Sequence, residues 1–139
     1  MSIPTRLPPV VLVVDDDPLM RCLLTHLLHG SVDGYEVVTI ADGEQALAQL
    51  TQRVVPLLIT DYNMPGMTGV MLATQVKARW PETRTVLMSA DRVSDLEGQP
   101  RMQSVDGFLL KPFPLHHLRS IVAQLLAGGA VRSVGSWNT

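Results

Sequence analysis

The sequence predicts an α/β protein in which a five-stranded parallel sheet is covered by helices on both faces. Short apolar runs typical of strands alternate with segments in which apolar residues recur every three or four positions. The first run, Val10–Val14, is continuously apolar, as in a strand that is covered on both faces. A length of 139 residues, with 46% hydrophobic and 17% charged residues, fits one globular domain with a single core.

Helix start and stop signals divide the chain into these elements. Asp17 and Pro18 supply an N-cap and a first-turn proline after the first strand, Gly30 supplies a stop, and Asp42 caps a second helix. Helices are therefore expected between Pro18 and Gly30, from Asp42 through Leu50, from Val70 to Trp80 and from Leu115 to Leu126. Strands are expected at 10–14, 35–40, within 54–60, at 85–88 and at 108–110.

The segment between the last two strands is harder to interpret. The alternation requires a helix within Val93–Val105, but Gly98 and Pro100 both disfavour a helix interior, so we expect this helix to be short, kinked or partly irregular. We expect residues 1–8 to form an N-terminal extension and residues 9–127 the folded domain. Residues 128–139 contain Gly and Ser without periodicity, and we expect a flexible tail.

Charge and hydropathy exclude several classes of function. With 11 basic and 13 acidic residues the net charge is −2, which offers no broad basic surface for nucleic acid. The longest apolar run has five residues, far short of a membrane span, and Pro8 and Pro9 interrupt any signal-peptide pattern. The single cysteine, Cys22, excludes an internal disulfide and a multi-cysteine metal site. A cytoplasmic protein without nucleic-acid or membrane partners is expected.

Polar residues follow the ends of four predicted strands. Because ligands of parallel α/β sheets lie beyond the carboxyl ends of the strands, these residues are expected to meet at one edge. Two unit charges about 4 Å apart interact by about 4 kcal/mol at an effective dielectric constant near 20, so a carboxylate cluster requires protonation or cations. A lysine supplies one positive charge, and Mg²⁺, which prefers oxygen ligands, fits as the second cation. The residues at these strand ends are Asp15, Asp16, Asp17, Asp61, Ser89 and Lys111.

Such a site is suited to phosphoryl transfer onto an aspartate. A carboxylate beside a bound metal can attack phosphorus and form an aspartyl phosphate. The transfer depends on positioning and on neutralisation of the phosphoryl oxygens more than on acid–base catalysis. Lys111 and the metal would neutralise those oxygens, and the hydroxyl of Ser89 would donate a hydrogen bond.

Four sequence blocks resemble the receiver domain of bacterial two-component response regulators. They occur in the family's order over about residues 9 to 127, at 13–17, 59–69, 87–90 and 108–113. The resemblance implies a CheY-like, flavodoxin-like doubly wound fold of three layers with five helices. It also implies a stand-alone signalling protein that receives a phosphoryl group from a sensor histidine kinase or a histidine phosphotransfer protein. A downstream protein would dock near the helix within 93–105, the fifth strand and the final helix.

The resemblance also implies roles for individual residues. Asp61 would be the phospho-acceptor, and Lys111, followed by a cis peptide to Pro112, the phosphate-binding lysine. Ser89 and Phe108 would form the conformational switch. The expected Mg²⁺ ligands are Asp16 directly, Asp15 largely through a metal-bound water, Asp61, and the main-chain oxygen of Asn63.

Two further positions correspond to family sites that tune hydrolysis of the acyl phosphate. They are Asn63 and Asp91, and polar residues at both could help to place water. We therefore expect a phosphorylated state of short to moderate lifetime. The receiver would phosphorylate and dephosphorylate only itself, so it is not expected to be a conventional enzyme.

Two alternatives stay open at this point. A magnesium-dependent phosphatase with an aspartyl nucleophile would use the Asp-x-Asp spacing of Asp15 and Asp17. Against it, Leu19 stands where such enzymes usually carry threonine or valine, and a substrate-covering cap is missing. A degenerate interaction domain that works without phosphorylation is disfavoured, because the acidic, hydroxyl and lysine residues are all present.

Overall fold

The computed structural model describes residues 7–90 and 103–127, which form a parallel sheet flanked by helices. The strand order is β2-β1-β3-β4-β5, and all neighbouring strands run parallel. This is the flavodoxin-like order of doubly wound folds, so the expected sheet is confirmed. Its strands are β1 (Val10–Val14), β2 (Glu36–Ile40), β3 (Leu57–Asp61), β4 (Arg84–Ser89) and β5 (Gly107–Leu110).

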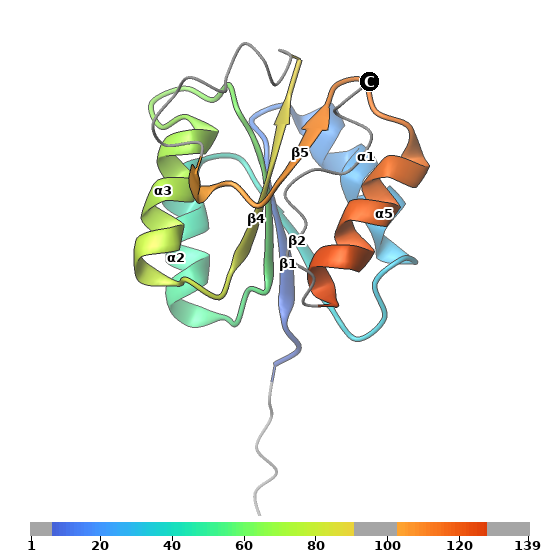
Figure 1. Ribbon diagram of the computed structural model, residues 1–139, viewed down its shortest axis with the longest axis horizontal. Helices are drawn as coiled ribbons and strands as arrows, with labels where there is room; N and C mark the ends of the chain where they lie inside the picture. The colour runs from blue at the N-terminus through green and yellow to red at the C-terminus, as the bar shows by residue number, and fades with distance from the viewer. Residues whose placement is uncertain (1–6, 91–102, 128–139) are drawn as a thin grey trace, which may run out of the picture.

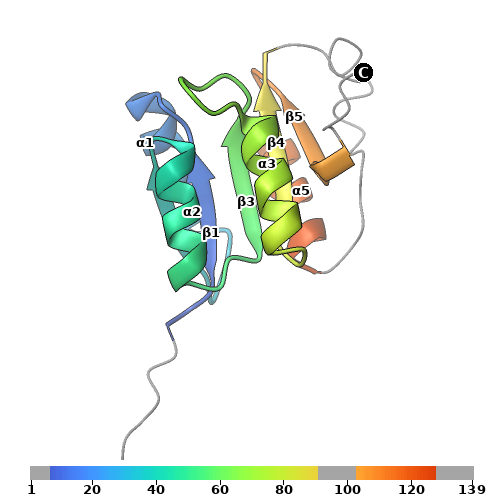
Figure 2. The same ribbon diagram turned by 90° about the vertical axis from the view of Figure 1, so that its left-hand side faces the viewer.

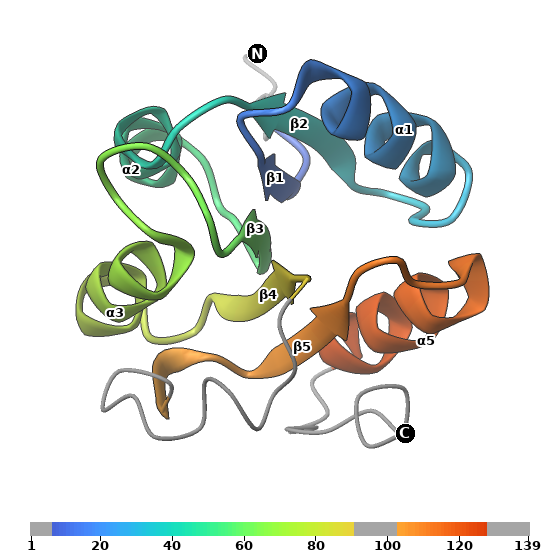
Figure 3. The ribbon, with the colours of Figure 1, turned by 90° about the horizontal axis from the view of Figure 1, so that it is seen from above.

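Helices cover both faces of this sheet. The described residues contain α1 (Pro18–His29), α2 (Gly43–Gln52), α3 (Gly69–Arg79) and α5 (Leu115–Leu126). Helices α1 and α5 lie on one face and α2 and α3 on the other, which gives three layers (Figures 1 and 3). Figure 2 shows α2 across β1 and α3 across β3 and β4. None of these four helices has the length and hydropathy needed to cross a membrane.

Four of the five expected helices are therefore present. The remaining expected helix, within Val93–Val105 between β4 and β5, falls mostly on residues outside the described ranges, and so do Gly98 and Pro100. Its expected irregularity remains a prediction. The expected extension at 1–8 and tail at 128–139 also lie mostly or wholly outside the described residues.

Side-chain caps start three of the helices, and two of these caps, Asp17 and Asp42, are the ones that the sequence predicted. The carboxylate of Asp17 accepts from the Leu19 N–H at 3.0 Å, and that of Asp42 accepts from the Gln45 N–H at 2.8 Å. The hydroxyl of Thr68, which begins α3, accepts from the Met71 N–H at 3.2 Å. Each cap satisfies a backbone N–H that the first turn of a helix leaves unpaired.

The core consists of two apolar layers, one on each face of the sheet. Successive residues of a strand point to opposite faces, so Val11 and Val13 pack toward α1 and α5, whereas Val10, Leu12 and Val14 pack toward α2 and α3. All five residues of β1 are fully buried. This explains why the strand lacks the apolar–polar alternation of a half-exposed sheet. The two layers fix the strands, and the strands fix the residues at their carboxyl ends.

Backbone packing is very close where α3 begins beside the end of β3. The Gly69 N–H donates to the Tyr62 carbonyl at 2.9 Å. A β-carbon at position 69 would lie against the carbonyl oxygen of Asp61 and 2.7 Å from Cδ1 of Leu87. Any side chain here would therefore displace the connection that carries Asp61.

Replacement of Gly69 by alanine is expected to lower the free energy of unfolding by about 2 kcal/mol, the usual scale for overpacking a close contact. Gly30→Ala is the matched control, because a β-carbon there would have no atom within 4 Å. The control should change the free energy of unfolding by no more than about 0.5 kcal/mol. Urea denaturation measures both values, and equal effects of the two substitutions would contradict the close contact at Gly69.

Candidate functional site

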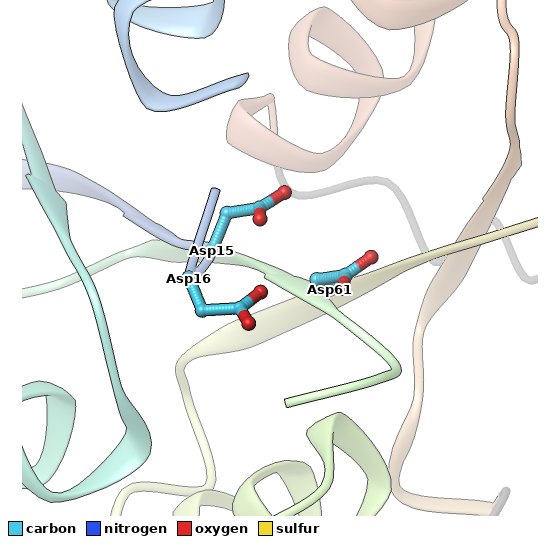
Figure 4. Close-up of side chains that lie close together, drawn as sticks. All are labelled: Asp15, Asp16 and Asp61. Carbon is cyan, nitrogen blue, oxygen red and sulfur yellow. The ribbon is translucent and has the colours of Figure 1, made fainter. Parts of the chain in front are cut away.

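Three carboxylates come together at the carboxyl ends of β1 and β3. Asp15, Asp16 and Asp61 each contribute an oxygen to a group whose atoms lie within 4.8 Å of one another (Figure 4). Strands β1 and β3 are direct neighbours in the sheet, which brings residues far apart in sequence side by side. Asp15 and Asp61 are only 1% and 8% exposed, whereas Asp16 is exposed to solvent. The trio is thus open on the side of Asp16.

Lys111 provides a positive charge beside two of these carboxylates. Its Nζ atom lies 2.8 Å from Oδ1 of Asp61 and 3.5 Å from Oδ2 of Asp15. The residue follows β5, and its backbone N–H donates to the carbonyl of Ser89 at 2.7 Å. The peptide bond between Lys111 and Pro112 is cis, as the resemblance implied. The lysine thus connects the ends of β1, β3 and β5.

Several hydrogen bonds hold the turn after β1. The Asp17 N–H donates to Oδ1 of Asp15 at 2.9 Å, and the Asp15 N–H donates to the carbonyl of Ile40 at 3.0 Å. Asp17 itself caps α1, as the sequence indicated. Nη1 of Arg21 donates to the main-chain carbonyl of Asp15 at 2.8 Å. Sequence reasoning missed Arg21, because a bond to a main-chain oxygen leaves no signal in the sequence.

Burial and charge shift two of the protonation equilibria in the site. Burial raises the pKa of the Asp15 carboxyl above its ordinary value, although the Asp17 N–H and the Lys111 charge act in the opposite direction. Burial would lower the pKa of the Lys111 ammonium, but its hydrogen bond to Asp61 and the charges of Asp61 and Asp15 outweigh this effect. The pKa of Lys111 is therefore raised, and the lysine is positively charged at neutral pH.

The remaining predicted residues lie around the acidic group or outside the described ranges. Ser89 ends β4 beside β3 and is 1% exposed, whereas Asn63 is exposed in the loop after β3. Phe108 is fully buried on β5, in a cluster with apolar residues of α3 and β4. Asp91 lies outside the described residues, so its expected effect on hydrolysis stays a prediction.

The donor set fits a magnesium ion. Three carboxylates and one ammonium leave two negative charges in the ionised site, and all the candidate donors are hard oxygen ligands of the kind that Mg²⁺ prefers. The exposed carboxylate of Asp16 leaves an open side where waters or phosphoryl oxygens could complete an octahedral shell. Asp15, Asp16 and Asp61 are thus the residues that could hold the ion.

Comparison with known proteins places this site in a family. The family model for the response regulator receiver domain matches residues 11–123. The chain is 35% identical over 119 residues to the response regulator protein FleR of Pseudomonas aeruginosa, covering 86% of this chain and 24% of FleR. It is 37% identical over 130 residues to the sensor histidine kinase TmoS of Ectopseudomonas mendocina, covering 89% of this chain and 13% of TmoS.

Solved structures agree with this assignment. The response regulator TrrA of Thermotoga maritima, in complex with Mg²⁺ and BeF, superposes with a TM-score of 0.75 at 30% identity. That comparison covers 84% of this chain and 98% of TrrA. A second TrrA structure, in complex with the histidine kinase ThkA, has a TM-score of 0.74 at 29% identity and covers 85% and 98%.

The fold is that of a signalling receiver, and the chain belongs to the response regulator receiver domain family. It spans about a quarter or less of the length of the curated relatives FleR and TmoS.

The raised pKa of Asp15 gives a stability prediction. Because burial disfavours the ionised carboxylate, Asp15→Asn should increase the free energy of unfolding at neutral pH without divalent ions. The gain should disappear as pH falls through the raised pKa toward the ordinary value, because the wild-type carboxyl is then protonated.

Urea unfolding in EDTA at neutral and acidic pH measures this difference. Asp33→Asn, at an exposed position, is the control and should leave the stability unchanged at both pH values. A loss of stability in Asp15→Asn at neutral pH would contradict the assigned cost of burying this charge.

Proposed function

We propose that this chain is a receiver that accepts a phosphoryl group on Asp61 in a Mg²⁺-dependent reaction. One observation carries the proposal: Nζ of Lys111 lies 2.8 Å from Oδ1 of Asp61, which belongs to a group of three carboxylates that fits a divalent cation. The TrrA complex with Mg²⁺ and BeF supports it by similarity, because that relative binds both in a receiver of the same fold. The proposed unit spans residues 9–127, and the family match at 11–123 supports these limits.

In the proposed reaction, a carboxylate oxygen of Asp61 attacks phosphorus and forms the new P–O bond. The bond from phosphorus to the donor breaks, and its electron pair leaves with the donor. Mg²⁺, when bound, neutralises phosphoryl oxygens. Lys111 moves its hydrogen bond from the Asp61 carboxylate to a phosphoryl oxygen, and the Ser89 hydroxyl donates to another. Asp16, Asp61 and the main-chain oxygen of Asn63 would hold the ion, and Asp15 would act largely through a metal-bound water.

Phosphorylation would then shift an equilibrium between two surface conformations. Ser89 moves toward the phosphoryl group, and Phe108 occupies the space that this movement vacates. The docking surface for a downstream protein would lie near β5, α5 and the segment that precedes β5. Asn63 and Asp91 would set a short to moderate lifetime of the phosphorylated state by placing water near the acyl phosphate.

The phosphatase alternative receives no support from the comparisons. The family match and the compared relatives are signalling proteins. Asp15, the nucleophile that a phosphatase would use, is 1% exposed, and its Oδ1 accepts the Asp17 N–H. Nζ of Lys111 lies 2.8 Å from Asp61 but 3.5 Å from Asp15. The positive charge that would neutralise a phosphoryl group is thus nearer to Asp61, which favours Asp61 as the phospho-acceptor. The chain would accordingly modify only itself.

Helix α1 offers a contact surface for a protein donor beside this site. Leu19 and Leu23 are 79% and 50% exposed, and Cys22 is exposed between them. The spacing of these residues places them on one side of the helix. Together they form an exposed apolar patch, a feature that on protein surfaces marks sites of protein contact. We propose that a histidine kinase or histidine phosphotransfer protein docks here, and the TrrA complex with ThkA supports such a partner by similarity.

Incubation with acetyl phosphate and Mg²⁺ should add one phosphoryl group to the wild-type protein, and chelation of Mg²⁺ should prevent it. Asp61→Asn should abolish the adduct, because amide nitrogen and oxygen are poor nucleophiles toward phosphorus. Asp15→Asn should slow the reaction but retain the adduct. Intact mass spectrometry reads these outcomes, and an adduct that persists in Asp61→Asn but disappears in Asp15→Asn would favour the phosphatase.

The donor surface can be tested separately from the chemistry. Replacement of both Leu19 and Leu23 by serine should slow transfer from a phosphorylated histidine phosphotransfer protein by about tenfold or more, the scale of losing an interface hot spot. Labelling by acetyl phosphate should be unchanged, because neither side chain enters the site. Val54→Ser, at a 73% exposed position after α2, is the control. If the double substitution slowed transfer from the phosphotransfer protein and labelling by acetyl phosphate equally, a docking role would be contradicted.

A further inference from the structure

We propose that Arg21 is a positioning residue for the Mg²⁺ site, an inference that rests on the proposed function. Its guanidinium Nη1 reaches back from α1 and donates to the main-chain carbonyl of Asp15 at 2.8 Å. Asp15 and Asp16 supply two of the three carboxylates of the site. The hydrogen bond therefore fixes the backbone from which both carboxylates project.

The stability of α1 does not explain an arginine at this position. Asp17 is the N-cap, so Arg21 lies at the end of the first turn. A cation there is opposed by the positive end of the helix dipole, and acidic side chains are the favoured choice. The first turn of α1 contains no acidic residue beyond the cap. A cation that the helix dipole disfavours at its position, but that contacts a candidate site, is expected to serve that site.

Peptide geometry explains how Arg21 acts on Asp16. The carbonyl oxygen of Asp15 and the amide nitrogen of Asp16 lie in one planar peptide unit. A donor that holds this oxygen therefore fixes the direction in which the chain enters Asp16. The Asp15 side chain is already held by the Asp17 N–H and by Lys111. Asp16 is exposed, so orientation of its backbone is the main contribution that Arg21 can make.

Two physical effects of Arg21 have opposite signs. As a positioning residue, it reduces the ordering that Asp16 must undergo when it binds an ion, and its removal weakens Mg²⁺ binding. As a mere positive charge near the site, it repels Mg²⁺, and its removal strengthens binding. The sign of the change in Mg²⁺ affinity thus distinguishes the two roles.

The experiment measures the dissociation constant for Mg²⁺ by calorimetry or amide NMR shifts. Arg21→Met is expected to raise it by about tenfold, the lower end of the effect of losing an outer-shell partner of a metal ligand. Arg21→Lys, which keeps a donor and the charge, should recover most of this loss. Arg53→Met is the matched control, because Arg53 also donates to a main-chain carbonyl, that of Pro8 at 2.8 Å, but from the start of the loop after α2.

A second measurement separates positioning from general destabilisation. In an Asp16→Asn background, Arg21→Met should change the Mg²⁺ dissociation constant by less than about twofold, because the ligand that it positions is already lost. Urea denaturation of each variant shows whether the protein is folded. Tighter binding in Arg21→Met, unchanged binding, an equal loss in Arg53→Met, or an undiminished loss in the Asp16→Asn background would each overturn the proposal.

The outcome can be told apart from failure of the proposed function. Suppose that wild-type protein binds Mg²⁺ more tightly than Asp16→Asn does, but acetyl phosphate does not label Asp61. The proposed function then fails, and the dissociation constants still decide the role of Arg21. If Asp61 is labelled and Arg21→Met binds Mg²⁺ as tightly as wild type, only the role of Arg21 fails.

Discussion

The contact of Lys111 with Asp61 and Asp15 is the interaction on which the site depends. One ammonium group joins carboxylates from β1 and β3 to the end of β5, at 2.8 and 3.5 Å. It offsets only part of the charge that three neighbouring carboxylates bring together. The repulsion that remains favours binding of a divalent cation. A site that is incompletely neutralised by the protein itself can respond to a metal and a phosphoryl group, whereas a fully paired site would be inert.

The fold provides this contact by fixing strand ends. Strands β1, β3 and β4 are buried between two helical layers, so the residues just after them have little freedom. Close packing of Gly69 against β3 holds the chain immediately after Asp61. The exposed leucines of α1 begin within a few residues of Asp15 and Asp16. Chemistry and the proposed donor surface therefore share one edge of the molecule.

Much of the fold could be predicted because its signals are local. The apolar run Val10–Val14 and the periodicity of Leu115–Leu126 matched the observed elements, and β4 extends only one residue beyond its predicted span at each end. Around Gly98 and Pro100, local propensity conflicts with the alternation of elements, and these residues lie outside the described ranges, so the irregular helix expected there stays a prediction. The common edge of Asp61 and Lys111, fifty residues apart, followed from the rule for parallel strand ends.

The contact of Arg21 could not be foreseen, because its partner is a main-chain oxygen that every residue possesses. The difference in burial between Asp15 and Asp16 also depends on tertiary packing.

The most direct test of the central claim is a structure of the protein with Mg²⁺ and beryllofluoride. The account predicts a BeF₃ group on a carboxylate oxygen of Asp61, Mg²⁺ held by Asp16 and Asp61, and Nζ of Lys111 in contact with a fluorine atom. Beryllofluoride on another residue, or an unmodified Asp61 still paired with Lys111 at saturating Mg²⁺ and beryllofluoride, would contradict it.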